Sequence, residues 1–149
     1  MYTIEEFDKT KTRVLKYIMY KKRTENEVKR KFADEDSELL DDVIEHLKEI
    51  GYINDNSYVE RAVSEFMNLN NLSLKELRYK LQTKGVDVKV LENYMCNHSE
   101  ELGEYEINSA KNIIIKKQNT MEEQAIIQHL LKKGYKMDSI KQAINSINV

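Results

Sequence analysis

The sequence predicts an all-α fold of three tandem three-helix repeats in an elongated, curved array. The 149 residues contain no proline and only four glycines, so the strongest helix breaker is absent and little material remains for tight hairpin turns. Apolar residues recur with helical spacing along almost the whole chain. These apolar stripes also repeat at a nearly constant interval, which indicates one supersecondary unit used three times.

The first and third helices of each repeat present apolar faces at matching positions. Val59, Val63 and Phe66 have the i, i+4 and i+7 spacing of residues that share one side of a helix. Equivalent first-helix residues, 48 apart, are Val14, Ala62 and Ala110, and Ile18, Phe66 and Ile114. Equivalent third-helix residues, 48 and 49 apart, are Val43, Leu91 and Ile140, and Leu47, Met95 and Ile144. A repeat of this size buries little surface alone, so neighbouring repeats must stack.

The second helix of each repeat begins with a capping box, in which a hydroxyl and a glutamate satisfy free amides at the start of the helix. The boxes are Thr24 with Glu27, Ser73 with Glu76 and Thr120 with Glu123. Gly85 and Gly134 stand where the second helices of the second and third repeats should end, because glycine readily adopts the left-handed conformation found there. Gly51 ends the third helix of the first repeat in the same way. Counting back from the glycines shifts the third repeat by two residues relative to its capping box.

These signals predict nine helices. The repeats are expected at residues 1–52, 53–98 and 99–149 of one continuous array. The helices are expected at 5–22, 24–33, 37–50, 55–69, 73–84, 87–97, 100–118, 120–133 and 137–147. An elongated body of this kind offers a long surface, which suits a large partner better than a small-molecule pocket.

Charge is unevenly distributed, although the net charge is only −2. Residues 1–33 hold ten basic and five acidic residues, whereas residues 34–65 hold two basic and eleven acidic residues. A basic end beside an acidic middle can meet two kinds of surface. The alternative is that these charged side chains are ordinary surface residues in contact with water and bind no partner.

No catalytic, metal or cofactor motif is present. The sequence lacks a glycine-rich phosphate loop, a serine elbow and a His-Glu-x-x-His pair, so we expect no enzymatic activity. Cys96 is the only cysteine, and with His98 it makes half a zinc site at best. We therefore expect neither a metal nor a cofactor.

We expect a cytoplasmic monomer without membrane attachment. No segment reaches the length of apolar sequence that a membrane span needs. The first seven residues are acidic rather than apolar, unlike a signal peptide.

Basic clusters accompany each second helix and are the best binding candidates. One cluster per repeat can form a positive ridge that follows a nucleic-acid backbone or an acidic filament surface. The candidates are Lys21, Lys22, Arg23, Lys29, Arg30, Lys31, Arg78, Lys80, Lys84, Lys132, Lys133 and Lys136. For Lys84, Lys132 and Lys133 the alternative is that a lysine at a helix end merely complements the helix dipole.

The segment from Val43 to Val59 resembles the signature of the RecX family. In that pattern a helix ends in Leu-x-x-x-Gly-Tyr, an Asn/Asp pair follows, and an aromatic residue opens the next helix. The matching residues are Leu47, Gly51, Tyr52, Ile53, Asn54, Asp55 and Tyr58. Two further segments, Glu76–Val86 and Leu130–Tyr135, resemble the second- and third-repeat helices of the family, so the resemblance extends over roughly residues 10 to 147.

The signature residues read mainly as structural. Gly51 stops a helix, Tyr52 and Ile53 can pack back on it, and Asp55 or Asn54 can cap the next helix. We expect them to set the angle between repeats rather than to touch a partner. The chain departs from the family at Asn68–Leu72, which replaces a basic, glycine-containing stretch, and in having 19 lysines against 5 arginines.

The resemblance implies a negative modulator of the RecA recombinase. Proteins of this family bind the RecA–DNA filament and limit its growth or its ATPase, strand-exchange and SOS-repressor-cleavage activities. DNA would then be contacted directly or through RecA. Two alternatives stay open: a nucleic-acid-binding helical repeat protein without a RecA role, and a scaffold for another helical partner.

Overall fold

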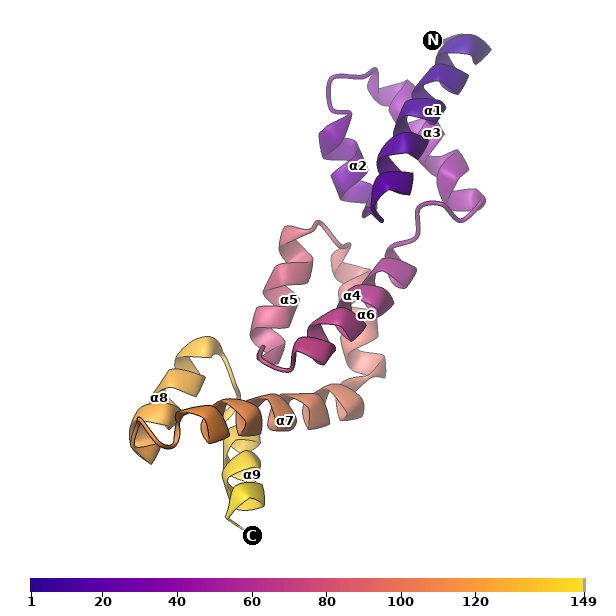
Figure 1. The fold of residues 1–149 in the computed structure, drawn as a ribbon. Coiled ribbons are helices and arrows are strands. Elements are labelled where there is room, and N and C mark those ends of the chain that lie inside the picture. Colours follow the sequence, from indigo (N-terminus) through magenta and orange to yellow (C-terminus); the bar gives the residue numbers. More distant parts are fainter. Residues whose placement is uncertain (149) are drawn as a thin grey trace.

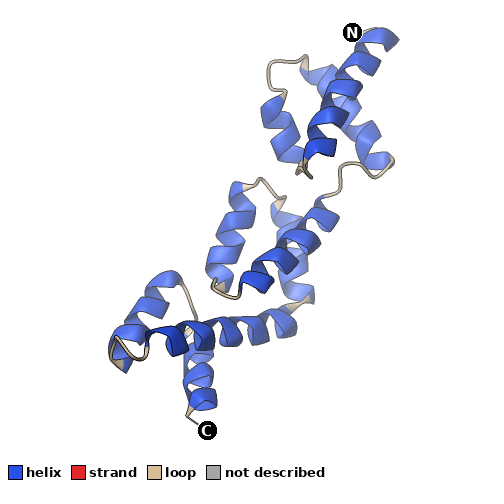
Figure 2. Ribbon diagram, in the orientation of Figure 1, coloured by secondary structure: helices blue, strands red, loops and turns tan. Residues whose placement is uncertain are grey.

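The computed structural model describes residues 1–148, which form nine α-helices and no strand (Figure 2). The predicted all-α class is therefore confirmed. The helices are α1 (Ile4–Tyr20), α2 (Glu25–Lys31), α3 (Ser37–Glu49), α4 (Asp55–Leu69), α5 (Leu74–Thr83), α6 (Val88–Asn97), α7 (Ser99–Lys117), α8 (Glu123–Lys133) and α9 (Met137–Ile147). We call α1–α3, α4–α6 and α7–α9 units 1, 2 and 3.

The three units follow one another along an elongated molecule (Figure 1). The second helices α2, α5 and α8 lie on the same side of the array in this view, and the chain termini lie at opposite ends. Within residues 1–148, no helix is both long and apolar enough to cross a bilayer.

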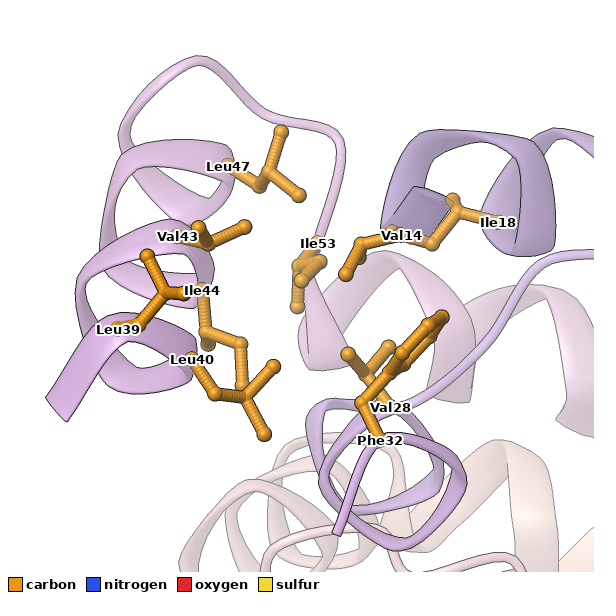
Figure 3. Close-up of a cluster of buried hydrophobic side chains, with 10 residues drawn as sticks. All are labelled: Val14, Ile18, Val28, Phe32, Leu39, Leu40, Val43, Ile44, Leu47 and Ile53. Carbon is orange, nitrogen blue, oxygen red and sulfur yellow. The ribbon is translucent and has the colours of Figure 1, made fainter. Parts of the chain in front are cut away.

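Three hydrophobic clusters hold the helices together. In unit 1 the apolar faces of the three helices converge on one buried cluster (Figure 3). Its members are Val14, Ile18, Val28, Phe32, Leu39, Leu40, Val43, Ile44, Leu47 and Ile53. Burying one such aliphatic side chain contributes about 1.5–3 kcal/mol, so each of these short helices depends on its neighbours for stability.

Each of the first two clusters is completed by the start of the next unit. Ile53, which precedes α4, is 3% exposed and belongs to the cluster of unit 1. Leu102 and Tyr105, on the first half of α7, belong to the cluster of unit 2. The second half of α7 carries Ala110 and Ile114 into the cluster of unit 3. The units therefore share residues at their borders, and the division of the chain at residues 52 and 98 stays a prediction.

Two of the three predicted capping boxes form. Thr24 and Ser73 each cap their helix, with the glutamate three residues later completing the box. The box predicted at Thr120 is wrong, because α8 begins at Glu123 with Glu122 as its N-cap and Thr120 lies in the preceding turn. The spacing between the N-cap and the following glycine is kept. Glu122 precedes Gly134 by 12 residues, as Ser73 precedes Gly85.

Candidate interaction surface

The junction between units 1 and 2 is made by polar contacts at the N-terminus of α2. The Thr24 hydroxyl donates to the backbone oxygen of Lys84 at 2.7 Å, and the Asn26 side-chain amide donates to that of Gly85 at 2.6 Å. Gly85 has a φ of +84°, and a Cβ there would lie 2.8 Å from the Cβ of Asn26. The start of α2 and the end of α5 are thus locked in close contact.

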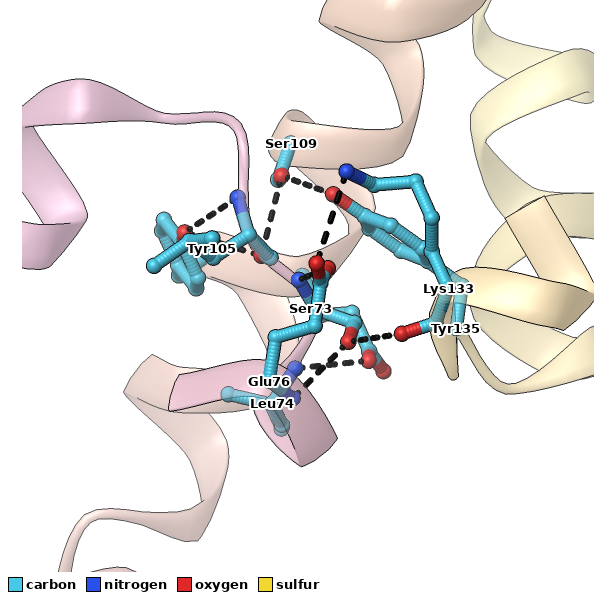
Figure 4. A network of polar contacts seen from close by, with 9 residues as sticks. Ser73, Leu74, Glu76, Tyr105, Ser109, Lys133 and Tyr135 are labelled. Atoms are coloured by element: carbon cyan, nitrogen blue, oxygen red, sulfur yellow. Dashed lines mark hydrogen bonds and ion pairs between the residues drawn. The ribbon is translucent and has the colours of Figure 1, made fainter. Parts of the chain in front are cut away.

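The junction between units 2 and 3 repeats this arrangement (Figure 4). The Ser73 hydroxyl donates to the backbone oxygen of Lys133 at 2.8 Å, and the Lys133 ammonium lies 3.5 Å from the Glu76 carboxylate. Gly134 has a φ of +102°, and a Cβ there would lie 2.8 Å from the Cβ of Lys75. The start of α5 therefore meets the end of α8 as the start of α2 meets the end of α5.

A carboxylate from the next unit also reaches each of these helix starts. Asp55 accepts a hydrogen bond from the Glu25 amide at 3.0 Å, in the first turn of α2. Glu106, only 1% exposed, accepts from the Leu74 amide at 3.1 Å and from the Ser139 hydroxyl at 2.8 Å. Both carboxylates satisfy free amides at a positive helix end.

A buried hydroxyl network closes the second junction (Figure 4). Tyr105 and Ser109 both donate to the backbone oxygen of Leu72, at 2.9 and 3.1 Å. Since the Ser109 proton is used there, the Tyr135 hydroxyl donates to the Ser109 oxygen at 2.5 Å. Burial raises the pKa of Tyr105 and of Tyr135 above the ordinary value, because the phenolate form would be poorly solvated.

These junctions join α2 to α5 and α5 to α8, and each of these second helices carries basic side chains. Most of these side chains are solvent-exposed. We define the basic ridge as the exposed residues Lys29, Arg30, Lys31, Lys80, Lys84, Lys132 and Lys136, on or beside α2, α5 and α8.

Four of the predicted cations have partners within the protein. Lys29 pairs with Glu25 at 3.2 Å, Arg78 pairs with Glu92, and Lys133 pairs with Glu76 across the second junction. Arg30 reaches the backbone oxygen of Thr83 at 3.5 Å. Arg78 and Lys133 are only partly exposed and lie outside the basic ridge as defined.

Glu25 links α2 to α3 as well. The Lys48 ammonium lies 2.9 Å from its carboxylate. Partial burial opposes ionisation, but hydrogen bonds from Lys48 and Lys29 hold the pKa of Glu25 below its ordinary value. The hydrogen bond to Glu25 in turn raises the pKa of Lys48.

Lys21, Lys22 and Arg23 lie before the start of α2 and not on a second helix. They line a groove of about 670 Å³ between the end of α1 and α4, which we call groove 1. The Arg23 guanidinium lies 4.1 Å from the centre of the Tyr17 ring. The sequence grouped these three residues with the second helices, but the structure places them beside the family signature, because α1 ends at Tyr20 next to the start of α4.

The signature residues occupy the turn between α3 and α4. Gly51 has a φ of +88°, and the Tyr52 amide donates to the Leu47 oxygen at 2.9 Å, as in a Schellman helix end. Asn54, rather than Asp55, caps α4 by accepting from the Ser57 amide at 3.2 Å. Leu47 and Ile53 are buried, whereas Tyr52 is half exposed. Tyr58 is partly buried and lines groove 1.

Sequence reasoning missed three contributors to these surfaces. Arg61 adds a cation to groove 1, and Asn26 and Glu106 hold the junctions. Of these three residues, only Glu106 has a signal in the sequence: it is a charged residue directly before an apolar position of α7. The contacts of Arg61 and Asn26 depend on how units pack, which no local pattern encodes.

No metal site is found in the described part of the chain, where no group of three or more His, Cys, Asp and Glu side chains lies close enough to hold an ion. Cys96 is exposed, and the His98 ring stacks on Tyr94 with its Nδ1 2.9 Å from the Tyr94 oxygen.

Sequence and structure comparisons give a consistent set of relatives. The chain matches no protein-family model. It is 32% identical over 139 residues to regulatory protein RecX of Staphylococcus haemolyticus, covering 90% of this chain and 52% of that protein. It is 32% identical over 140 residues to regulatory protein RecX of Finegoldia magna, covering 86% of this chain and 66% of that protein. The chain thus spans between about half and two thirds of the length of these relatives.

The fold agrees with these matches. A crystal structure of RecX from Lactobacillus salivarius superimposes with a TM-score of 0.81 at 24% identity, covering 98% of this chain and 99% of that one. Two independent curated relatives and a solved structure of the same fold lead to one conclusion: the chain belongs to the RecX family.

Proposed function

We propose that this protein is a negative modulator of RecA that binds the RecA–DNA filament and limits its growth or activity. Family membership supports a regulator, and the exposed cations of the second helices offer a binding surface. The activities restrained are ATP hydrolysis, strand exchange and cleavage of the SOS repressor. The protein acts as a cytoplasmic monomer and needs no cofactor of its own.

The proposal is supported by exposed cations on each second helix and by the bonds that join each second helix to the next. The hydroxyls of Thr24 and Ser73 hold each second helix against the end of the next one. A filament is a periodic, negatively charged target, and a row of cations at repeated positions matches such a target better than it matches a single compact ligand.

The mechanism is steric and electrostatic. An elongated body lying across several RecA protomers blocks the movements and additions that the filament needs. Lysines dominate the basic ridge and act as point charges, so its contacts should weaken with salt. Phosphate contacts of this kind fix position without reading sequence.

The acidic stretch from Asp34 to Glu49 faces basic RecA surface in this proposal. It covers α3 and the turn before it, and most of its carboxylates are exposed. Arg13 pairs with Glu35, and Lys48 pairs with Glu45 at 3.4 Å, so only part of this charge is neutralised within the chain. The signature residues act indirectly, by fixing the angle between units 1 and 2.

Charge reversal on the basic ridge tests the proposal. Reversing Lys29, Arg30 and Lys31 together would also break the contacts of Lys29 and Arg30 with Glu25 and Thr83. A cleaner variant reverses one exposed lysine on each second helix. It is Lys31→Glu/Lys80→Glu/Lys132→Glu.

This variant should lose inhibition of the RecA ATPase while its helical circular dichroism stays unchanged. The matched control reverses exposed lysines of α1, α6 and α9, namely Lys9→Glu/Lys89→Glu/Lys141→Glu, and should inhibit as the wild type does. Equal inhibition by both variants would remove the basic ridge from the mechanism.

A nucleic-acid-binding role without RecA is the second candidate, and groove 1 favours it. A salt titration separates the two, since binding through phosphates alone weakens steeply with salt. Tight capture by RecA filaments with feeble binding to free DNA supports the first candidate.

A further inference from the structure

Groove 1 combines cations with exposed aromatic rings. Lys21, Lys22 and Arg61 line it, and its one acidic residue, Glu65, pairs with Arg61 at 3.4 Å. Tyr20 on its edge is 87% exposed. Met19 and Tyr52, which also line groove 1, are 71% and 49% exposed, so Tyr20 belongs to a patch of exposed apolar side chains.

The fold builds an equivalent groove at the second junction, and its chemistry differs. Groove 2, of about 590 Å³, lies between the end of α4 and α7. Asn68 and Asn70 line it, 48 residues after Tyr20 and Lys22. Acidic residues of α7, including Glu101, line its other side. Lys111 and the buried Tyr105 also line groove 2. The asparagines at the positions equivalent to Tyr20 and Lys22 indicate that packing of the units does not require a tyrosine and a lysine there, so these two side chains of groove 1 are available to contact a ligand.

Arg23 adds a further cation to the groove. Its guanidinium lies 4.1 Å from the centre of the Tyr17 ring, so a positive charge is held at the wall of groove 1.

We propose that groove 1 binds single-stranded nucleic acid, with phosphates against Lys21, Lys22 and Arg61 and a base stacked on Tyr20. A positive groove that follows the backbone, combined with aromatic rings for the bases, is the arrangement that binds single strands without sequence preference. A protein surface can use both the cations and the tyrosine rings, and it is the alternative occupant that the experiments below test. None of the basic-ridge residues lines groove 1, although Lys31 lies 5.9 Å from the centre of the Tyr17 ring that Arg23 contacts. The site does not depend on RecA binding.

Fluorescence anisotropy with a labelled oligothymidylate tests the site on the full chain. Lys21→Glu/Lys22→Glu should lower the slope of log K against log salt by about 1.4, since each phosphate contact of a single strand contributes about 0.7. Tyr20→Ala should weaken oligothymidylate binding about fivefold or more through lost stacking.

Inorganic polyphosphate separates the two parts of the site because it carries charge without bases. Its binding should fall in Lys21→Glu/Lys22→Glu and stay unchanged in Tyr20→Ala. Matched controls are Lys9→Glu/Lys16→Glu, on exposed lysines of α1 outside the groove, and Tyr79→Ala, an exposed tyrosine of α5. Both controls should bind oligothymidylate as the wild type does.

Oligothymidylate binding that is unchanged in Lys21→Glu/Lys22→Glu, or equally weakened in Lys9→Glu/Lys16→Glu, overturns the proposal. So does a groove variant that binds oligothymidylate normally but no longer co-sediments with RecA filaments, because the groove then receives a protein surface. Loss of oligothymidylate binding with intact inhibition of the RecA ATPase supports groove 1 and leaves the basic ridge proposal standing.

Discussion

The hydroxyl of Thr24 donates a hydrogen bond to the backbone oxygen of Lys84, 60 residues later in the chain. The same hydroxyl accepts the Glu27 amide at 3.0 Å, so one side chain caps the start of α2 and the end of α5 together. Ser73 makes the equivalent bond to Lys133, also across 60 residues. The same side-chain hydroxyl therefore caps its own helix and bonds to the neighbouring unit.

Replacing Thr24 by valine should lower the free energy of unfolding by about 1–2 kcal/mol, because the cap and the junction bond are lost together. Urea denaturation followed by circular dichroism measures this change. Thr120→Val is the matched control, since Thr120 is exposed and is not the N-cap of α8. It loses only the bond from its hydroxyl to the Lys117 oxygen at 3.3 Å, so its effect should stay within about 0.5 kcal/mol. A larger loss at Thr120 than at Thr24 would contradict the assignment of the caps.

Gly51 and Gly85 both have a positive φ, but only at Gly85 would an added Cβ also clash with a neighbouring side chain. Gly51→Ala should lower the free energy of unfolding by about 1–2 kcal/mol, because only the left-handed backbone is strained and a Cβ there meets nothing within 4 Å. Gly85→Ala adds a contact with Asn26 and should cost about 1–3 kcal/mol more.

Gly103→Ala provides the control within α7, where a Cβ also meets nothing, and should stabilise the protein by up to about 1 kcal/mol. Thermal or urea unfolding of the three variants gives the order directly. Equal losses at Gly51 and Gly85 would show that the first junction has room to relax.

The buried carboxylate of Glu106 should tolerate an amide far better than an apolar side chain. In Glu106→Gln one oxygen still accepts the Leu74 amide, and the Ser139 hydroxyl can turn to accept from the new NH₂ group. In Glu106→Leu both donors lose their acceptor, for a loss of about 2–4 kcal/mol in the free energy of unfolding. Similar urea midpoints for the two variants would mean that these hydrogen bonds contribute little.

Alkaline pH should unfold the protein through its buried tyrosines. The pKa values of Tyr105 and Tyr135 are raised in the folded chain, so the unfolded chain loses protons first as the pH rises above the ordinary value of 10.0. The stabilising contribution is complete below pH 10 and falls above it, by about 1.4 kcal/mol per pH unit for each such tyrosine.

Urea denaturation across this range, together with phenolate absorbance, measures the effect. Tyr135→Phe should reduce the slope of stability against pH above 10. A slope that is the same in the variant would show that Tyr135 ionises without unfolding.

Local signals predicted most of the helix starts and ends. Thr24 and Ser73, each followed by a glutamate three residues later, predict the starts of α2 and α5. Gly85 and Gly134 predict helix ends, where the backbone has a positive φ. Thr120 satisfies the same local pattern yet does not cap α8, whose N-cap is Glu122. Its hydroxyl instead donates to the Lys117 oxygen at the end of α7.

The surfaces could be predicted only in part. Charge and spacing identified the cations of the second helices, but their grouping into one ridge depends on bonds across 60 residues. Lys21 and Lys22 were assigned to that ridge, whereas they line groove 1 with Arg61, because the end of α1 lies across this groove from α4. No local pattern contains that arrangement.

The central claim is that the basic ridge restrains the RecA filament. The most direct measurement is the rate of ATP hydrolysis by RecA on single-stranded DNA as this protein is added. A rate that falls with added wild type, and stays high with Lys31→Glu/Lys80→Glu/Lys132→Glu, is the predicted result. A rate that the wild type leaves unchanged at saturating concentration would contradict the claim.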